Sequence, residues 1–233
     1  MIKKAMILAA GFGKRVLPLT SEKPKPLLKL GDQTLLSNTL NFLQNYGIKE
    51  VIINVHYLGE EIIKYINKNK FNLNIHIEEE KEKILDTGGG VLNVIDHFSN
   101  EPFIIINPDT IWNVKYLEEL NEMEKIFLKD QNKCLILVVK NEKSFDKSFK
   151  GDFNLNKNLI TKEKNEKLKY TYTGLQIVQP NIFSNISDRI FSLNKIWDKL
   201  ILQKELHAFE SKIDFLHVST LSIYKNLIKK LVV

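Results

Sequence analysis

Hydrophobic and polar residues follow two alternating patterns along the first 140 residues. Short apolar runs, typical of strands buried on both faces, occur at Ala5–Ala9, Val51–Val55, Leu73–Ile77, Phe103–Ile106 and Cys134–Val139. Longer segments with the spacing of amphipathic helices lie between them, at about Thr34–Tyr46, Gly59–Asn67, Gly89–Phe98 and Val114–Lys129. This alternation predicts an α/β fold whose mostly parallel central sheet is covered by helices on both faces.

The pattern changes after Lys140. The expected elements there are antiparallel strands at Lys150–Leu155, Leu159–Lys162 and Tyr170–Gln179, a helix at about Leu193–Gln203, a pair of strands near His207–Val218 and a helix from about Thr220. We interpret residues 1–233 as a single domain. Its first half, about 1–140, is expected to bind a nucleotide, and about 141–233 form a smaller antiparallel portion for another substrate.

Composition narrows the possible partners. Hydrophobic residues make up 43% of the chain and charged residues 27%, which is ordinary for a globular protein. No apolar run approaches the roughly 20 residues that a membrane span needs, so no membrane partner is expected. Cys134 is the only cysteine, which excludes a disulfide framework and a cysteine-based zinc site within one chain. We expect a cytoplasmic protein, as a monomer or small homo-oligomer.

The formal net charge of +6 comes from lysines that are scattered along the chain and interleaved with glutamates. A nucleic-acid-binding protein concentrates its positive charge on one face or arm. The sequence therefore predicts no nucleic-acid partner, and anionic small molecules suit the same charge.

A loop from Ala9 to Leu27 gathers residues that are scarce elsewhere. It contains Gly11 and Gly13, and Arg15 is one of only two arginines in the chain. The loop follows a predicted strand at the carboxyl edge of the sheet, where open α/β folds bind ligands. Glycines there let backbone N–H groups approach phosphate oxygens. The loop lacks the third glycine of a dinucleotide fingerprint and the Gly-Lys-Ser/Thr of a P-loop.

The residues Leu8–Arg15, then Pro18–Thr20 and Pro24–Leu27, resemble the signature of the sugar-1-phosphate nucleotidyltransferases. The similarity extends along the chain and is strongest to bacterial enzymes acting on N-acetylmuramate 1-phosphate or mannose 1-phosphate. It implies a Rossmann-like fold and two partners, a nucleoside triphosphate and a sugar 1-phosphate. It also implies a Mg²⁺ cofactor, with Mn²⁺ as an alternative, and release of pyrophosphate.

The same match implies roles for individual residues. The expected nucleotide contacts are Ala10, Gly11, Gly13, Lys14 and Arg15, with Gly88 and Gly89 beneath the base. Arg15 and Lys25 are the expected catalytic residues, and Lys25 would bridge the two reacting phosphates. The expected sugar-phosphate contacts are Lys25, Asn107, Gly151, Asp152, Thr173 and Gly174. Asp109 would bind the metal.

The chemistry is consistent with a site rich in lysine and arginine. A sugar phosphate is already an anionic nucleophile, so no general base is required. The obstacle is repulsion between two anions, which fixed cations and a metal ion reduce while they align the attack.

Two positions depart from the family pattern. Pro108 stands before Asp109, where the family usually has glycine, and His217 stands where it commonly has a second metal-binding aspartate. His217 could bind a metal other than Mg²⁺, since imidazole suits Mn²⁺, Zn²⁺ or Co²⁺, or it could mark weakened metal binding. With a shifted alignment it is a structural histidine and Asp214 is the nearby carboxylate. The alternative function is a catalytically weak nucleotide-sugar sensor or assembly subunit.

Overall fold

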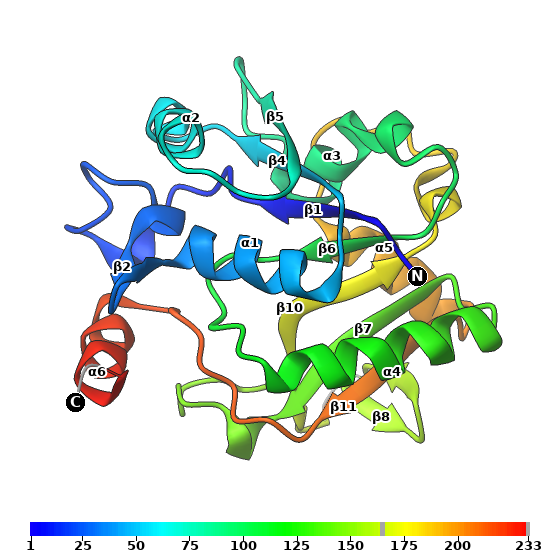
Figure 1. Cartoon of the computed structure of the whole chain (residues 1–233). Coiled ribbons are helices and arrows are strands. Elements are labelled where there is room, and N and C mark those ends of the chain that lie inside the picture. The colour runs from blue at the N-terminus through cyan, green and yellow to red at the C-terminus, as the bar shows by residue number, and fades with distance from the viewer. Residues whose placement is uncertain (164–165, 232–233) are drawn as a thin grey trace.

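The strands of the computed structural model, which describes residues 1–163 and 166–231, form one large sheet and a small hairpin (Figure 1). Their bounds are β1 Lys4–Leu8, β2 Lys29–Leu30, β3 Gln33–Thr34, β4 Glu50–Val55, β5 Asn74–Glu79, β6 Phe103–Ile106, β7 Cys134–Lys140, β8 Asn154–Asn156, β9 Leu159–Thr161, β10 Tyr170–Val178 and β11 Leu206–Ser211. The large sheet has the order β5-β4-β1-β6-β10-β7-β11-β9-β8, and β2 pairs with β3.

Most of this sheet is parallel, as predicted. β1 lies parallel to β4 and β6, β4 to β5, and β7 to β11. β10 is inserted antiparallel between β6 and β7, and β9 pairs antiparallel with β11 and β8. The second half of the chain thus extends the same sheet with a smaller antiparallel part.

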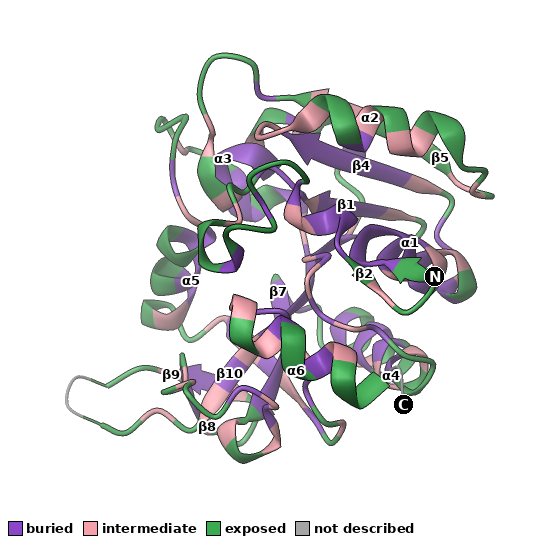
Figure 2. Cartoon of the chain, turned by 90° about the vertical axis from the view of Figure 1, so that its left-hand side faces the viewer, coloured by how far each residue is buried: buried purple, intermediate pink, exposed green. Residues whose placement is uncertain are grey.

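Helices cover both faces of the sheet. Their bounds are α1 Leu35–Tyr46, α2 Gly59–Lys68, α3 Asp86–Asn93, α4 Lys115–Lys129, α5 Leu193–Leu202 and α6 Leu221–Leu231, with 3₁₀ turns η1 Lys14–Val16, η2 Lys25–Leu27, η3 Ile95–Phe98, η4 Asn141–Lys143 and η5 Pro180–Phe183. α1, α2 and α4 share one core cluster, and α3 and α5 share another on the opposite face. The buried strands lie between helices whose outer faces are exposed (Figure 2).

Helix α1 shows how local sequence fixes the element bounds. The Thr34 hydroxyl accepts a hydrogen bond from Ser37 N and the Ser37 hydroxyl accepts one from Thr34 N, which forms a capping box. The helix ends at Tyr46, and the next residue, Gly47, caps it with a left-handed φ of 101°. Between these ends Leu40 is fully buried, and burial of such a side chain stabilises the fold by about 1.5–3 kcal/mol.

The C-terminal helix α6 packs on the loop that follows β1 instead of on the main sheet. Val16 in η1 is completely buried in a small cluster with Tyr224 and Leu227 of α6. The Tyr224 hydroxyl donates a hydrogen bond to Lys29 O at 2.7 Å. In Figure 1, α6 lies beside β2. The helix therefore supports the segment that carries Lys14 and Arg15.

The expected pair of strands near His207–Val218 is wrong. β11 ends at Ser211 and has neighbours on both sides, β7 and β9, so no strand following it directly can pair with it as a hairpin. The chain instead leaves the sheet, and Phe215 and His217 form single bridges with Ser144 and Thr110. This route brings the segment beside the turn after β6.

Three other boundaries differ from the prediction. The helix expected from Gly89 begins at Asp86, so the glycines lie inside α3, and its last turns form the separate η3. The strand expected from Lys150 begins at Asn154, after a single bridge at Phe153.

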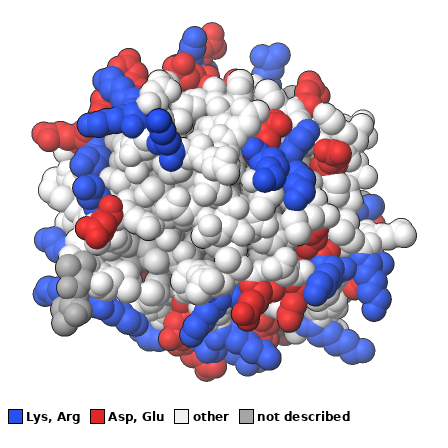
Figure 3. Space-filling view, viewed as in Figure 1, with Lys and Arg blue, Asp and Glu red and all other residues white. Residues whose placement is uncertain are grey.

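Charged side chains are distributed over the surface as their scatter along the sequence suggests. On the face shown in Figure 3, basic and acidic side chains are interspersed and much of the centre is uncharged. Among the described residues no helix combines the length and the hydropathy that crossing a membrane requires.

Candidate active site

A cavity of about 460 Å³, here called the first cavity, lies at the carboxyl ends of β1, β4 and β6. These strands are parallel, so the turns that follow them meet at one edge of the sheet. The predicted site residues that line this cavity are Ala10, Gly11, Gly13, Lys14, Arg15, Lys25, Asn107 and Asp109. Residues from three separate stretches of sequence therefore lie round one space.

The phosphate-binding loop of the prediction is held in a tight turn. Gly13 has a left-handed φ of 64°, and a Cβ there would lie 3.0 Å from the Thr20 methyl group. The Thr20 hydroxyl donates to Gly13 O at 3.0 Å. Tyr57 stabilises the loop at Thr20, because its hydroxyl donates to Thr20 O at 3.0 Å. Glycine is required at position 13 by conformation as well as by space.

Lys25, Asp109 and His217 form the charged centre of the first cavity. The Lys25 ammonium forms an ion pair with Asp109 Oδ2. His217 Nδ1 lies 3.5 Å from Asp109 Oδ1 and 3.4 Å from the Thr110 hydroxyl. The side chains of Asp109 and His217 are mostly buried, with 19% of the Asp109 side chain and 13% of the His217 side chain exposed.

The environment keeps this centre in defined protonation states. Loss of solvation disfavours the Asp109 carboxylate, but the charges of His217 and Lys25 outweigh it and lower the pKa of Asp109 to about 2. Loss of solvation also lowers the pKa of His217 to about 4, helped by Lys25 and Arg15 and opposed by Asp109. An imidazole with that pKa is neutral at pH 7, so at neutral pH the charge that holds Asp109 ionised is that of Lys25.

The donor atoms here suit a divalent cation. Asp109 Oδ1 is buried and accepts no hydrogen bond from the described residues, and a neutral imidazole nitrogen lies beside it. No group of three or more His, Cys, Asp or Glu side chains gathers as a metal cluster in the described part of the chain. A metal held by Asp109 would therefore take most of its ligands from phosphate oxygens and water, as Mg²⁺ commonly does.

Asn54 also lines the first cavity, and the sequence analysis did not identify it. Asp86 and Thr87, which directly precede the predicted Gly88 and Gly89, line the cavity together with apolar Ile84. Asn54 Oδ1 accepts a hydrogen bond from Ala9 N at 3.0 Å, and Asn54 Nδ2 donates to buried Glu80 at 2.7 Å. Asn54 could have been identified from the sequence, because it is a polar residue inside the apolar strand β4 and lies close to the carboxyl end of that strand.

Ser219 is another lining residue that was missed. Its hydroxyl donates a hydrogen bond to buried Asp146. It reaches the cavity because Val218 N donates to Asp109 O at 2.9 Å, which places the C-terminal segment against the turn after β6.

Gly88 and Gly89 do not line the first cavity. Both are buried in the first turn of α3, and their N–H groups donate to Phe191 O at 2.9 and 3.0 Å. Their packing partners are therefore protein groups from the segment before α5.

A second cavity, of about 320 Å³, lies beside β10 and α5. Predicted residues Gly151 and Asp152 line it, together with Lys162, Asn194 and Trp197. The Asp152 carboxylate accepts a hydrogen bond from Tyr172 N at 2.9 Å. Aromatic surface with a few charged and amide groups is typical of small-molecule sites.

Thr173 and Gly174 line neither cavity, but they follow Tyr172, which lines the second one. The buried Thr173 hydroxyl donates to Leu137 O at 2.9 Å. Gly174 has a left-handed φ of 94°, and a Cβ there would lie 2.9 Å from Asn107 Cβ. The close neighbour of Gly174 is therefore Asn107, whose N–H donates to Gly174 O at 2.7 Å.

Known proteins resemble this chain in sequence and in structure. Residues 4–149 match the family model described as Nucleotidyl transferase. The chain is 26% identical over 203 residues to the N-acetylmuramate alpha-1-phosphate uridylyltransferase of Caulobacter vibrioides, covering 85% of this chain and 84% of that protein. It is 27% identical over 231 residues to the D-glycero-alpha-D-manno-heptose 1-phosphate guanylyltransferase of Aneurinibacillus thermoaerophilus, covering 98% of each.

A similar fold occurs in the crystal structure of HddC from Yersinia pseudotuberculosis. The TM-score is 0.76 at 21% identity, over 98% of this chain and 99% of that one. The family model covers more than half of the chain, and its match begins at β1 and includes the whole loop that carries Arg15 and Lys25. The chain therefore belongs to the nucleotidyl transferase family.

Proposed function

We propose that this protein transfers a nucleotidyl group from a nucleoside triphosphate to a sugar 1-phosphate and releases pyrophosphate. The observation that carries the proposal is the composition of the first cavity. Lys14, Arg15 and Lys25 line it, so three cationic side chains share the cavity with two carboxylates, those of Asp86 and Asp109. Such a site binds and neutralises phosphates, and it needs no activated side-chain nucleophile.

The proposed reaction is a displacement at the α-phosphorus. An oxygen of the sugar 1-phosphate forms a new bond to that phosphorus, and the bond from phosphorus to the bridging oxygen of the β-phosphate breaks. The electron pair leaves with pyrophosphate, so no proton has to be moved in the bond-making step. The products are a nucleoside diphosphate sugar and pyrophosphate.

The residues of the first cavity have distinct tasks in this scheme. The guanidinium of Arg15 presents a planar fork of donors to the triphosphate. The Lys25 ammonium, oriented by its ion pair with Asp109, lies where it neutralises charge on the reacting phosphates. Removing one such donor typically lowers kcat by about 10²–10³-fold. A divalent ion held by Asp109, with Mg²⁺ preferred and Mn²⁺ as the alternative, would add Lewis-acid stabilisation when bound.

We assign the sugar to the second cavity. Asp152, Lys162 and Asn194 offer a carboxylate, an ammonium and an amide to hydroxyl or amide groups of a sugar ring. Trp197 and Phe153 supply aromatic surface for the ring itself. Asn107 lines the first cavity and packs against Gly174, and in this proposal the reacting phosphate of the sugar binds near that contact.

The base and the sugar are narrower proposals. The relatives named above transfer uridylyl and guanylyl groups to N-acetylmuramate and heptose phosphates, according to their names. Uridylyl or guanylyl transfer in cell-envelope sugar metabolism is accordingly the proposed role. Thermal-shift measurements with the four nucleoside triphosphates and their sugar conjugates would separate the two bases.

The reaction class can be tested directly. The protein is incubated with each nucleoside triphosphate, Mg²⁺ or Mn²⁺ and a panel of sugar 1-phosphates, and pyrophosphate is measured. Turnover that falls by at least tenfold in Lys25→Met is the expected result. Lack of pyrophosphate release with every pair would count against a transferase.

A nucleotide-sugar sensor is the second candidate, and His217 favours it. A neutral imidazole beside Asp109 brings no negative charge to a metal ion. A sensor would bind a nucleoside diphosphate sugar tightly without turnover, and Lys25→Ala would change only the affinity.

A further inference from the structure

The segment between Arg189 and Leu193 is docked on the first turn of helix α3. Both Gly88 N and Gly89 N donate to Phe191 O, and Phe191 N donates to Leu85 O at 3.2 Å. These hydrogen bonds use N–H groups that a helix N-terminus leaves without partners. The N–H groups through which this turn could have bound a nucleotide are therefore already bonded to Phe191 O.

The side chain of Thr87 completes the docking. Leu193 N donates to the Thr87 hydroxyl at 2.9 Å, while Ser192, the residue between, caps helix α5. The backbone at the start of α5 is thus fixed from both sides, by its own cap and by α3.

Packing explains the glycines of this turn. A Cβ on Gly88 would lie 2.3 Å from the Phe191 ring, and a Cβ on Gly89 would lie 2.2 Å from Arg189 O. A phenyl ring can rotate away, but a backbone carbonyl in a docked segment cannot move as easily. Glycine inside a helix is unfavourable by about 1 kcal/mol relative to alanine, so its use here indicates a requirement for close contact.

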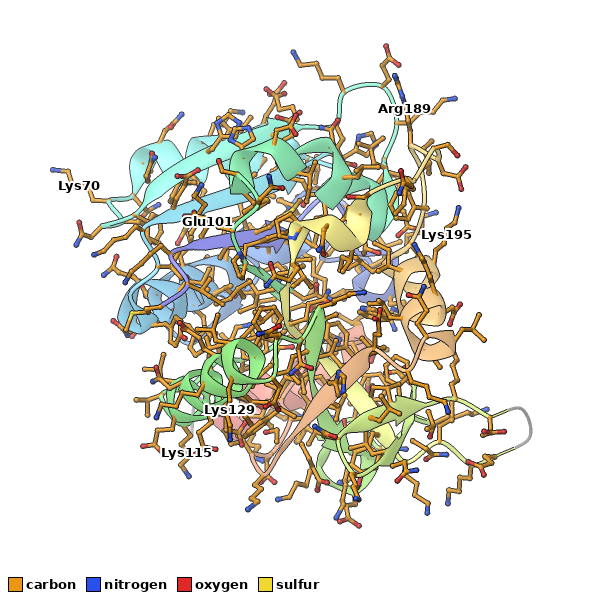
Figure 4. The ribbon with its side chains drawn as sticks, turned by 90° about the vertical axis from the view of Figure 1, so that its right-hand side faces the viewer. Lys70, Glu101, Lys115, Lys129, Arg189 and Lys195 are labelled. Atoms are coloured by element: carbon orange, nitrogen blue, oxygen red, sulfur yellow. The ribbon has the colours of Figure 1, made fainter. Side chains whose placement is uncertain are left out.

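The docked segment leads directly into the wall of the second cavity. Asn194 and Trp197 of α5 line that cavity, and the Trp197 ring packs 4.8 Å from that of Tyr172. The side chains of Arg189, the first docked residue, and of Lys195, just beyond the last, extend outward from the molecule (Figure 4). The contacts with α3 therefore hold this part of the wall of the second cavity from its inner side.

We propose that Thr87, Gly88 and Gly89 are positioning residues for the second substrate. They hold residues 189–193 on α3 and thereby set the places of Asn194 and Trp197. The proposal rests on the proposed function in one respect, that the sugar 1-phosphate binds in the second cavity. It makes an unexpected prediction, because the turn adjoins the first cavity yet its alteration affects the substrate of the second.

Two neighbouring substitutions provide a matched test. Gly89→Ala directs a methyl group at Arg189 O, whereas Gly90→Ala directs one at Asn54 Nδ2 and Glu80 Oε1, 2.7 and 2.8 Å away. In Gly89→Ala the KM for sugar 1-phosphate should rise about tenfold or more, because displacements near 1 Å cost catalysis up to 10². Affinity for a non-hydrolysable nucleoside triphosphate should stay within about threefold in that variant and fall more in Gly90→Ala.

Hydrogen exchange supplies a readout that needs no turnover. In Thr87→Val the Leu193 amide loses its acceptor and should exchange at least about tenfold faster, whereas Thr87→Ser keeps the hydroxyl and should retain protection. This comparison still decides the docking if Gly89→Ala does not fold, or if no substrate pair gives pyrophosphate. Equal exchange at Leu193 in both Thr87 variants overturns the proposal. So does a Gly89→Ala enzyme that loses nucleotide affinity while its KM for sugar 1-phosphate is unchanged.

Discussion

Replacing His217 with asparagine should reduce the loss of stability that the protein suffers in acid. The folded environment lowers the pKa of His217 from 6.5 to about 4, chiefly by loss of solvation. Between these two values the unfolded chain binds a proton that the folded chain does not. The stability that comes from this difference in the pKa of His217 is therefore fully present above pH 6.5 and is lost progressively as the pH falls towards 4.

The size of the effect follows from the same pKa. At about 1.4 kcal/mol per pKa unit, a pKa lowered from 6.5 to about 4 removes about 3 kcal/mol over the whole window. At a pH of about 4.5 roughly 2 kcal/mol of this should be gone. Little discount for solvent is needed, because only 13% of the side chain is exposed. Asp109 contributes outside this window, since its pKa falls from 3.8 to about 2.

Urea unfolding from about pH 7 to 4.5 in the presence of a chelator measures this directly. The His217→Asn variant has no titrating group at this position, so the difference in unfolding free energy between the two proteins should shrink by about 2 kcal/mol over that range. The test compares how the unfolding free energy of each protein changes with pH. Absolute values are not compared, because the substitution also removes the packing of the imidazole against Phe215 and lowers stability at pH 7. Parallel stability curves for the two proteins would refute the reasoning.

Three further predictions concern binding and stability. Arg15→Lys should raise the KM for the nucleoside triphosphate about tenfold, because lysine cannot replace the planar fork; an unchanged KM in steady-state assays would exclude that role. Asp109→Asn should abolish the extra thermal stabilisation that Mg²⁺ or Mn²⁺ adds to the nucleotide complex, as measured by thermal shift with and without a chelator; a retained metal effect would place the metal elsewhere. Tyr46→Phe should lower the unfolding free energy by about 1–3 kcal/mol, since its hydroxyl donates to buried Glu124, and a change below about 0.5 kcal/mol in urea unfolding would contradict this.

Local patterns were sufficient to predict the parallel half of the sheet. Runs such as Phe103–Ile106 and Cys134–Val139 are apolar throughout and are completely buried as β6 and β7. The loop with Arg15 and Lys25 was equally predictable, because its glycines and cations are contiguous in sequence. Asp109 was assigned from the family match, and its position just after β6 puts it at the same edge of the sheet.

Features set by distant contacts could not be predicted. The antiparallel insertion of β10 between β6 and β7 depends on pairing across long stretches of chain. The glycines at positions 88 and 89 were interpreted as facing a base, but their contacts are Phe191 and Arg189, far along the chain. Asn54 contacts Glu80 and Ala9, and no pattern in its own strand specifies either partner.

The packing of α6 on the phosphate loop has a consequence during synthesis of the chain. Lys29 and Tyr224, which join the two segments by a hydrogen bond, are 195 positions apart. The loop leaves the ribosome early, but Val16 is covered only after α6 has emerged. Because a domain generally folds as a unit, a nascent chain that lacks α6 would carry Lys14 and Arg15 on a loop without this support. Nucleotide capture should therefore begin only after the residues of α6 have been synthesised.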